Sequence, residues 1–307
     1  VTVNGHPAGA KYVHCVPGDL VDAWYPEETT SVTPEPQLTP DILYEDESLV
    51  VVNKPAGQLS HPARSEQHGT VANAIAARYS GVGGAPEPVR LVHRLDRDTS
   101  GVLLFARTSA AARALARLRA AGTLVRDYLA LVSGQPPSAG EINVPLGSDP
   151  AHRTRRIALV RADNGSHRVV RFTNESQETG PAGHEVGLNA DLSFAAPFQE
   201  ARTTYQVIQY GQNAALIAAR LHTGRTHQLR AHMASIGHPL LGDDLYHGPH
   251  LPGLERQALH AWRVRLSHPM TGTLVIIQAP VPKDLREAAR SLLGHDTESP
   301  LPAGEAE

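Results

Sequence analysis

Short apolar runs bounded by turn-forming residues recur along this chain and predict most of its strands. Runs at 48–55, 102–106 and 124–132 predict buried strands. Alternating apolar and polar positions at 202–221 and 264–277, each interrupted by a turn, predict two hairpins. A substantial sheet is therefore expected in the central and C-terminal parts of the chain.

Helical signals fall between the predicted strands, at 70–79, 108–122, 226–235 and 283–293. The expected N-caps are Thr70, Thr108 or Ser109, and Thr226, because a hydroxyl can accept a hydrogen bond from the free N–H groups of a first turn. Hairpins dominate, and strands and helices do not alternate strictly. The pattern therefore predicts an α+β fold with a large, mostly antiparallel sheet.

Composition divides the chain into parts. Four prolines among Thr, Ser and Glu mark a linker at 26–40, where no secondary structure is expected. The predicted strands and helices define a main domain at 41–295, and the residues after it form an acidic tail at 296–307. The segment 1–25, before the linker, contains Asn4-Gly5, a dipeptide typical of a tight hairpin turn.

The bulk composition excludes several classes of protein. Cys15 is the only cysteine among 307 residues, so neither a disulfide framework nor a cysteine metal site is expected. No apolar run approaches the ~18 residues of a membrane span, and the N-terminus lacks a signal-peptide pattern, so a cytoplasmic location is expected. The 17 histidines are dispersed, and no glycine motif for phosphates or dinucleotides occurs. We therefore expect no metal and no nucleotide cofactor.

The distribution of charge is more informative than the net charge of −3. Residues 90–130 contain eight arginines and three aspartates, and residues 201–232 contain four arginines and no acid. By contrast, no Lys or Arg occurs between Lys11 and Lys54. Basic segments inside an acidic chain can form a phosphate-binding face, which predicts a nucleic-acid partner.

The strongest candidate for chemistry is the segment HRLDRDTSG at 93–101. Asp96 lies between Arg94 and Arg97, and turn-forming residues then lead into the buried strand predicted at 102–106. A carboxylate on a loop before a rigid strand is well placed for catalysis, and the neighbouring arginines are expected to favour its ionised form. The alternative is a surface Arg/Asp cluster in a turn.

The order of these residues resembles the HRLDxxTSG signature of the RluA-type pseudouridine synthases, which modify ribosomal and transfer RNA. The resemblance continues at 42–57, in LVRDYLALVSG at 124–134 and in LHTGRTHQLRAHMASIGHPLLGDDLY at 221–246. It implies the pseudouridine synthase fold, in which a large sheet carries the active-site cleft across one face. It also implies an RNA substrate, isomerisation of uridine without a cofactor, and a monomer.

The resemblance also assigns roles to individual residues. Asp96 matches the essential aspartate, Arg230 its ion-pair partner, and Tyr128 the tyrosine that stacks on a flipped uracil. Candidates for RNA contact are Arg94, Arg97, Arg225 and His227, for which structural hydrogen bonding around the loop is the alternative. The sequence leaves open whether Asp96 attacks the base, attacks the sugar or assists a glycal-forming path.

Two regions depart from the family pattern. Residues 1–25 resemble the last half of a small RNA-binding module. Two interpretations stay open: a remnant of that module, or an ordinary hairpin. Residues 161–200 are longer than the family interval and predict a loop insertion, with room for a short hairpin.

Two other functions compete with an RNA-modifying enzyme. One is a catalytically silent RNA-binding or ribosome-assembly factor on the same fold, which has no chemical need to keep Asp96, Tyr128 and Arg230 together. The other is a hydrolase using His93, Asp96 and Ser100, although the chain has no G-x-S-x-G nucleophile motif. Neither the RNA nor the uridine that is modified can be read from the sequence.

Overall fold

The computed structural model describes residues 2–4, 6–7, 16, 18–22, 32–80, 90–161, 167–172, 184–186 and 198–294. The chain divides into two compact units, Val1–Val32 and Thr33–Glu307. Among the helices of these described ranges, none has both the length and the apolar character needed to cross a bilayer.

The described residues of the first unit include a small antiparallel sheet of three two-residue strands. They are β1 (Thr2–Val3), β2 (His6–Pro7) and β3 (Val21–Asp22), in the order β2-β1-β3. The pairing of Val3 with His6 confirms the hairpin expected at Asn4, whose φ of 51° lies in the left-handed region that tight turns use. Whether this sheet is the remnant of an RNA-binding module stays a prediction.

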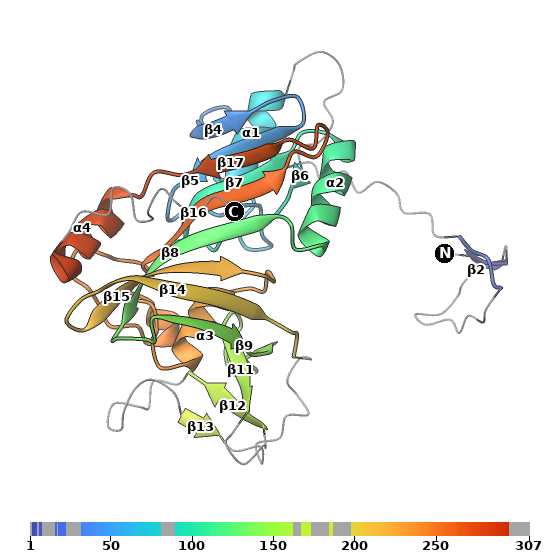
Figure 1. The fold of residues 1–307 in the computed structure, drawn as a ribbon. Coiled ribbons are helices and arrows are strands. Elements are labelled where there is room, and N and C mark those ends of the chain that lie inside the picture. The colour runs from blue at the N-terminus through green and yellow to red at the C-terminus, as the bar shows by residue number, and fades with distance from the viewer. Residues whose placement is uncertain are drawn as a thin grey trace. The chain divides into compact units, whose positions relative to one another are not determined.

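The second unit is built on a sheet of ten strands (Figure 1). The strands are β4 (Ile42–Glu45), β5 (Leu49–Lys54), β6 (Arg90–Leu91), β7 (Ser100–Ala106), β8 (Val125–Ser133), β9 (Ala139–Asn143), β14 (Arg202–Tyr210), β15 (Ala214–Leu221), β16 (Leu259–Ser267) and β17 (Leu274–Gln278). Their main order is β4-β5-β7-β16-β8-β15-β14-β9, with β17 paired to β16 and β6 to β7.

All of these pairings are antiparallel except the one between β7 and β16. The expected α+β fold with a large, mostly antiparallel sheet is therefore confirmed, and so are the two hairpins β14–β15 and β16–β17. The central strands are buried because apolar side chains cover both faces of β5, β7 and β8.

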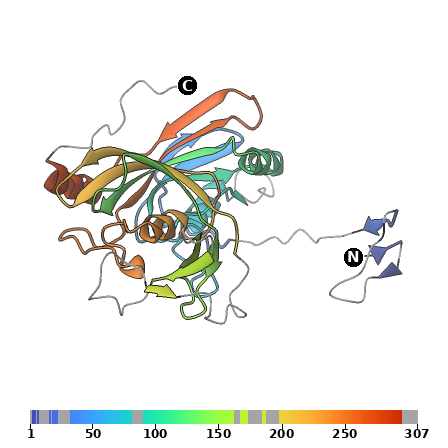
Figure 2. The ribbon, with the colours of Figure 1, turned by 60° about the horizontal axis from the view of Figure 1, so that its bottom comes forward.

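Within the residues that the structure describes, four helices and one 3₁₀ turn accompany the sheet. They are α1 (Val71–Tyr79), α2 (Ser109–Ala120), α3 (Gln228–Ser235), α4 (Lys283–Leu293) and the 3₁₀ turn η2 (Asp244–Tyr246). Turning the molecule in Figure 2 shows α3 on one side of the large sheet, together with the strands of a smaller sheet.

The capping predictions succeed at two helices and fail at the third. The hydroxyls of Thr70 and Thr108 accept from the backbone N–H groups of Asn73 and Ala111, at 3.3 Å and 3.1 Å. Helix α3 has no side-chain cap, because His227 and not Thr226 holds the N-cap position, with a left-handed backbone of φ 55°. The prediction of Thr226 as a cap was wrong.

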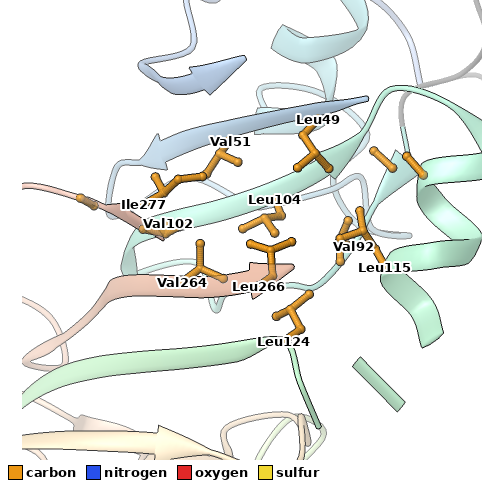
Figure 3. Packing of buried hydrophobic residues seen from close by; sticks show 13 residues of the cluster. Leu49, Val51, Val92, Val102, Leu104, Leu115, Leu124, Val264, Leu266 and Ile277 are labelled. Carbon is orange, nitrogen blue, oxygen red and sulfur yellow. The ribbon is translucent and has the colours of Figure 1, made fainter. Parts of the chain in front are cut away.

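The largest described core cluster lies where β5, β7, β16 and β17 meet α2 (Figure 3). Leu49, Leu104 and Leu115 are fully buried in it. Fully burying a leucine stabilises the fold by roughly 1.5–3 kcal/mol, so this cluster holds β7, which follows the HRLDRDTSG loop, rigidly in place.

A second, four-stranded antiparallel sheet contains β10 (Leu146–Ser148), β11 (Arg156–Arg161), β12 (His167–Arg171) and β13 (His184–Val186). Two of its strands fall in the segment 161–200, which was expected to be a loop insertion with room for a hairpin. The antiparallel pairing of β12 with β13 fits the hairpin for which that segment had room, and whether the segment is an insertion stays a prediction. The apolar face of the four-stranded sheet packs on α3 and on Tyr246, through Ala158, Val170 and Phe172.

The predicted linker at 26–40 is too long at its C-terminal end. The compact unit begins at Thr33, whose carbonyl accepts from the Asn73 side chain at 2.8 Å. Glu35 is buried and accepts from the Gly69 backbone N–H, so this stretch packs against the start of α1. Residues 23–31 lie outside the described part, as does the acidic tail at 296–307.

Gly101 allows β7 and β16 to approach each other closely. A Cβ atom built on it would lie 2.1 Å from the carbonyl oxygen of Ala261, and its φ is +114°. Ala261 also pairs with Tyr128 on β8. The glycine therefore brings the HRLDRDTSG loop within one strand of Tyr128.

We predict that Gly101→Ala prevents stable folding, because the methyl group would overlap backbone that cannot move aside. The expected loss in the free energy of unfolding exceeds about 4 kcal/mol, measured by thermal or urea denaturation. Gly122→Ala is the matched control: Gly122 has a φ of +73° but open space around its Cβ position. That variant should lose only roughly 1–2 kcal/mol, and equal losses in both would contradict the prediction.

Candidate active site

Asp96 lies in the turn between β6 and β7, in the second unit. Its backbone carbonyl accepts from the Thr99 N–H at 3.1 Å, which closes the turn. Its side chain is 24% exposed, so the carboxylate is open to a ligand while the loop around it is held.

Lys54 fixes one side of this loop. Its fully buried Nζ donates to the carbonyls of Pro55, Gln58 and Arg97 at 2.7, 2.7 and 2.6 Å. Burial lowers the pKa of Lys54 to about 7, although the nearby carboxylates of Asp98 and Asp96 act in the opposite direction. Three carbonyl acceptors match the three donors of an ammonium group, so the geometry favours the charged form.

Arg256 fixes the other side of the loop. Its Nη1 donates to the carbonyl of Asp98 at 3.0 Å, the residue next to the one that Lys54 holds. Its Nε and Nη2 form a bidentate pair with Asp284 on α4, at 2.7 and 3.1 Å. Two buried cations thus hold consecutive carbonyls of the loop, which restricts the position of Asp96.

Arg230 is the counter-charge of Asp96, as expected. It projects from α3, and its Nη1 lies 3.2 Å from Asp96 Oδ2. Its Nε and Nη2 donate to the two oxygens of Asp243, each at 2.7 Å. The pKa of Arg230 is raised, because the attraction of Asp243 and Asp96 outweighs its burial. One guanidinium therefore connects the loop carboxylate to a carboxylate that is fully buried.

Tyr128 approaches the same place from β8 and is 4% exposed. Burial raises the pKa of its phenol, and the charge of Asp96 contributes in the same direction, so the hydroxyl stays protonated at neutral pH. That hydroxyl makes no hydrogen bond with the described residues. A substrate group can therefore be its partner.

His227 is the third group at Asp96. Its Nε2 lies 3.9 Å from Asp96 Oδ2, and its Nδ1 lies 3.3 Å from the hydroxyl of Tyr246. Burial lowers the pKa of His227, so the imidazole is neutral at pH 7. The sequence singled out His227 as an RNA contact, but its side chain, only 12% exposed, faces Asp96.

Asp243 and Tyr246 were missed from the sequence, and so were Lys54 and Arg256. Asp243 and Tyr246 lie in GDDLY, at the end of the stretch that carries the family resemblance, and this was the available signal. The ring of Tyr246 lies under Arg230, with 5.3 Å from the guanidinium carbon to the ring centroid. It also packs edge-on against Phe172, at 5.0 Å between centroids.

The arginines next to Asp96 do not contact its carboxylate. Arg97 instead forms a bidentate pair with Glu66 at 3.2 and 2.6 Å, and Arg94 is exposed without a partner in the described ranges. Arg225 is exposed and donates through Nε to the Glu200 carbonyl at 2.9 Å. The neighbouring arginines, which were expected to favour the ionised form of Asp96, therefore point away from its carboxylate, and Arg230 is the arginine that pairs with it.

The hydrolase alternative fails on geometry. Ser100 is buried and its hydroxyl lies 2.9 Å from Nδ1 of the fully buried His260. His93 is also buried. A serine nucleophile must reach its substrate, and this one cannot.

Metal ligands do not gather at this site. Within the ranges that the structure describes, no three side chains of His, Cys, Asp or Glu lie together as a metal-binding group.

Comparisons with known proteins show the family of the chain. A family model described as RNA pseudouridylate synthase matches residues 48–235. A ribosomal large subunit pseudouridine synthase D of Nitrosomonas europaea is 36% identical over 272 residues, covering 85% of this chain and 68% of that protein. The uncharacterised RNA pseudouridine synthase YhcT of Bacillus subtilis is 38% identical over 267 residues, covering 86% and 76%.

Among solved structures, another pseudouridylate synthase has a similar fold. The human RNA pseudouridylate synthase domain-containing protein 4 superimposes with a TM-score of 0.60 at 24% identity, covering 81% of this chain and 92% of that one. At that identity the likeness shows the fold alone, and the fold is the one that the sequence implied.

We predict that Asp243→Asn destabilises the protein by about 3–5 kcal/mol, because it leaves the buried charge of Arg230 with an incomplete partner. Thermal denaturation measures this loss. The double variant Arg230→Met/Asp243→Asn removes the stranded cation as well and should recover part of the loss. A double variant that is less stable than wild type by the sum of the losses in Asp243→Asn and Arg230→Met alone would contradict the coupling.

Proposed function

Because the chain belongs to the RNA pseudouridylate synthase family, we propose that Asp96 is the essential carboxylate with which it isomerises uridine in RNA to pseudouridine. We further propose that its target uridine lies in the large ribosomal RNA. One observation carries the catalytic assignment: Asp96 is partly exposed, and Arg230 holds it at 3.2 Å beside Tyr128. Support for the target comes from the relatives that are named for the large ribosomal subunit.

The reaction conserves every atom of the uridine. The bond between N1 and C1′ breaks, a bond between C5 and C1′ forms, the proton on C5 leaves and N1 gains a proton. Oxidation state does not change, so a nucleophile, a proton acceptor and a proton donor are sufficient. Asp96 and Tyr128 are the groups that can supply them.

Asp96 acts while the glycosidic bond is broken. A carboxylate oxygen can attack C1′, attack the base, or take a proton from the sugar on a glycal-forming path, and all three routes require an anion at this point. The Arg230 guanidinium offers the counter-charge that an anion in a partly closed site needs.

Tyr128 acts on the base. Its ring can stack on the flipped uracil, because a flipped base loses the stacking of its neighbours and an aromatic face replaces it. Its protonated hydroxyl can exchange a proton with the rotated base, since it has no other partner among the described residues.

The exposed arginines contact the rest of the RNA in this proposal. Arg94 lies two residues from Asp96 and is exposed, so it is the candidate to occupy the space that the flipped uridine leaves. Arg225 is exposed at the start of the α3 segment and is a candidate for phosphate contact. Arg97 is a weaker candidate because Glu66 engages both of its terminal nitrogens. A ribosomal RNA target implies action in the cytoplasm, and we expect a monomer.

We predict that Asp96→Asn abolishes pseudouridine formation but leaves RNA affinity within roughly tenfold, because it removes the anion and keeps the shape. Carbodiimide adduct mapping by primer extension across ribosomal and transfer RNA measures the product, in a host lacking this gene. The strain is complemented with wild type, Asp96→Asn or Asp98→Asn.

Asp98→Asn is the matched control, because it removes the same charge from the same loop. Arg256 binds the backbone carbonyl of Asp98 and not its side chain, so the loop should keep its position in this variant. A site restored by wild type and Asp98→Asn but not by Asp96→Asn is the expected result. Restoration by Asp96→Asn would refute the catalytic role, and a site only in transfer RNA would refute the proposed target.

A separate prediction concerns the hydroxyl of Tyr128. Tyr128→Phe keeps the stacking ring but removes the proton, so kcat should fall by about 10²–10⁴, the range for one general acid or base. Single-turnover rates on a target RNA fragment measure it, with KM nearly unchanged. A normal kcat would show that the tyrosine only stacks.

A further inference from the structure

His227 is held in a backbone conformation that a histidine rarely adopts. Its φ of 55° and ψ of 23° are left-handed, and only two other described non-glycine residues, Asn4 and His247, have a positive φ. Such conformations cost energy and persist where the surrounding structure requires them. Here the conformation directs the imidazole at Asp96 instead of along α3.

The two carboxylate oxygens of Asp96 are not equivalent. Arg230 Nη1 and His227 Nε2 both approach Oδ2, at 3.2 and 3.9 Å. Oδ1 accepts no hydrogen bond from the described residues, whereas Oδ2 accepts from Arg230. Two groups converging on one oxygen orient the carboxylate and leave the other oxygen free.

Tyr246 determines which nitrogen of His227 carries the proton. The fully buried hydroxyl of Tyr246 accepts from the backbone N–H of Arg156 at 2.9 Å, and it lies 3.3 Å from His227 Nδ1. If Nδ1 also donated to it, the hydroxyl proton of Tyr246 would have no acceptor among the described residues. The hydroxyl therefore donates to Nδ1, and the proton of the neutral imidazole is on Nε2, which faces Asp96.

Burial favours the neutral ring of His227 by lowering its pKa, and the charged groups around it act in both directions: Asp96 and Asp243 raise the pKa, whereas Arg230 and Arg156 lower it. Asp96 faces it from the loop, Arg230 from α3, Asp243 and Tyr246 from the segment around η2, and Arg156 from β11. Arg230 already neutralises Asp243, so a second cation would be repelled by Arg230 in a buried place. Burial raises the pKa of Tyr246, which keeps its hydroxyl proton available for donation to Nδ1.

We propose that His227, fixed in its Nε2–H tautomer by Tyr246, is a positioning residue that donates to Asp96 Oδ2 in the substrate complex and makes Oδ1 the reacting oxygen. The proposal rests on the proposed role of Asp96. The 3.9 Å separation shortens to hydrogen-bond distance when the flipped uridine closes the site, as catalytic hydrogen bonds that are long without substrate commonly do.

Two substitutions at His227 distinguish this role from a backbone role. His227→Gln places an amide N–H near the position of Nε2, whereas His227→Asn is too short to reach Asp96 but tolerates a left-handed backbone better. Positioning predicts a kcat within about tenfold of wild type for Gln and about 100-fold lower for Asn, the cost of a misplaced reacting group.

The order of the two variants decides the question. A backbone role predicts the reverse order, with Asn more active than Gln, and that result would overturn the proposal. An RNA-binding role predicts a higher KM with kcat unchanged, and that result would overturn it too. A wild-type protein without turnover would instead count against the proposed function.

The tautomer can be tested without turnover. In protein labelled with ¹⁵N-histidine, the His227 signals, assigned by their loss in His227→Asn, should show a protonated Nε2 and a hydrogen-bonded, unprotonated Nδ1 at pH 7. Tyr246→Phe keeps the ring packed on Phe172 and removes the donor, so the Nδ1 signal should shift toward the mixed tautomers of a free imidazole. A wild-type protein with the proton on Nδ1 would refute the inference.

Discussion

The site depends on one shared guanidinium. Arg230 is bound on two of its nitrogens by the buried Asp243 and offers its third to Asp96, which is partly exposed. Asp243 neutralises most of the charge of Arg230, so the cation is stable in the interior of the fold. The bidentate geometry of the pair also fixes the direction in which the remaining nitrogen, Nη1, points. Asp96 therefore meets a counter-charge whose position is set before any substrate arrives, which is the condition for an anion to act in a partly closed site.

The rest of the fold brings the loop of Asp96 to that guanidinium and keeps it there. Lys54 at the end of β5 and Arg256 before β16 hold consecutive carbonyls of the loop, and Gly101 lets the strand after the loop lie directly against β16. Tyr128 then reaches the same place from the next strand. The small sheet contributes by supporting Tyr246 of η2, whose hydroxyl accepts from the Arg156 N–H on β11. The ring of Tyr246 lies beneath Arg230, and its hydroxyl contacts His227. The segment 161–200, which departs from the family pattern, thus belongs in part to a sheet that supports the site.

Sequence reasoning succeeded where a signal is local or where a motif carries it. The caps at Thr70 and Thr108 depend on residues three positions away, and the partnership of Asp96 with Arg230 followed from the family signature although 134 residues separate the two.

Sequence reasoning failed where the outcome depends on tertiary packing. Thr226 is not a cap because His227, with a left-handed backbone, holds the N-cap position. Arg97 pairs with Glu66 although it is adjacent to Asp96. The roles of Lys54, Arg256 and Asp243 could not be predicted, since each depends on which carbonyl or guanidinium the sheet brings beside it.

The central claim is that the protein uses one carboxylate, held by Arg230, to remake the bond between base and sugar. Tritium release tests it most directly, because the hydrogen on C5 of uracil must leave when that carbon bonds to the ribose. Purified wild-type protein and Asp96→Asn would be mixed with large ribosomal RNA transcribed with uridine tritiated at C5. Release by wild type, up to one tritium for each modified site, and none by Asp96→Asn is the predicted result. Equal release by both proteins would contradict the account.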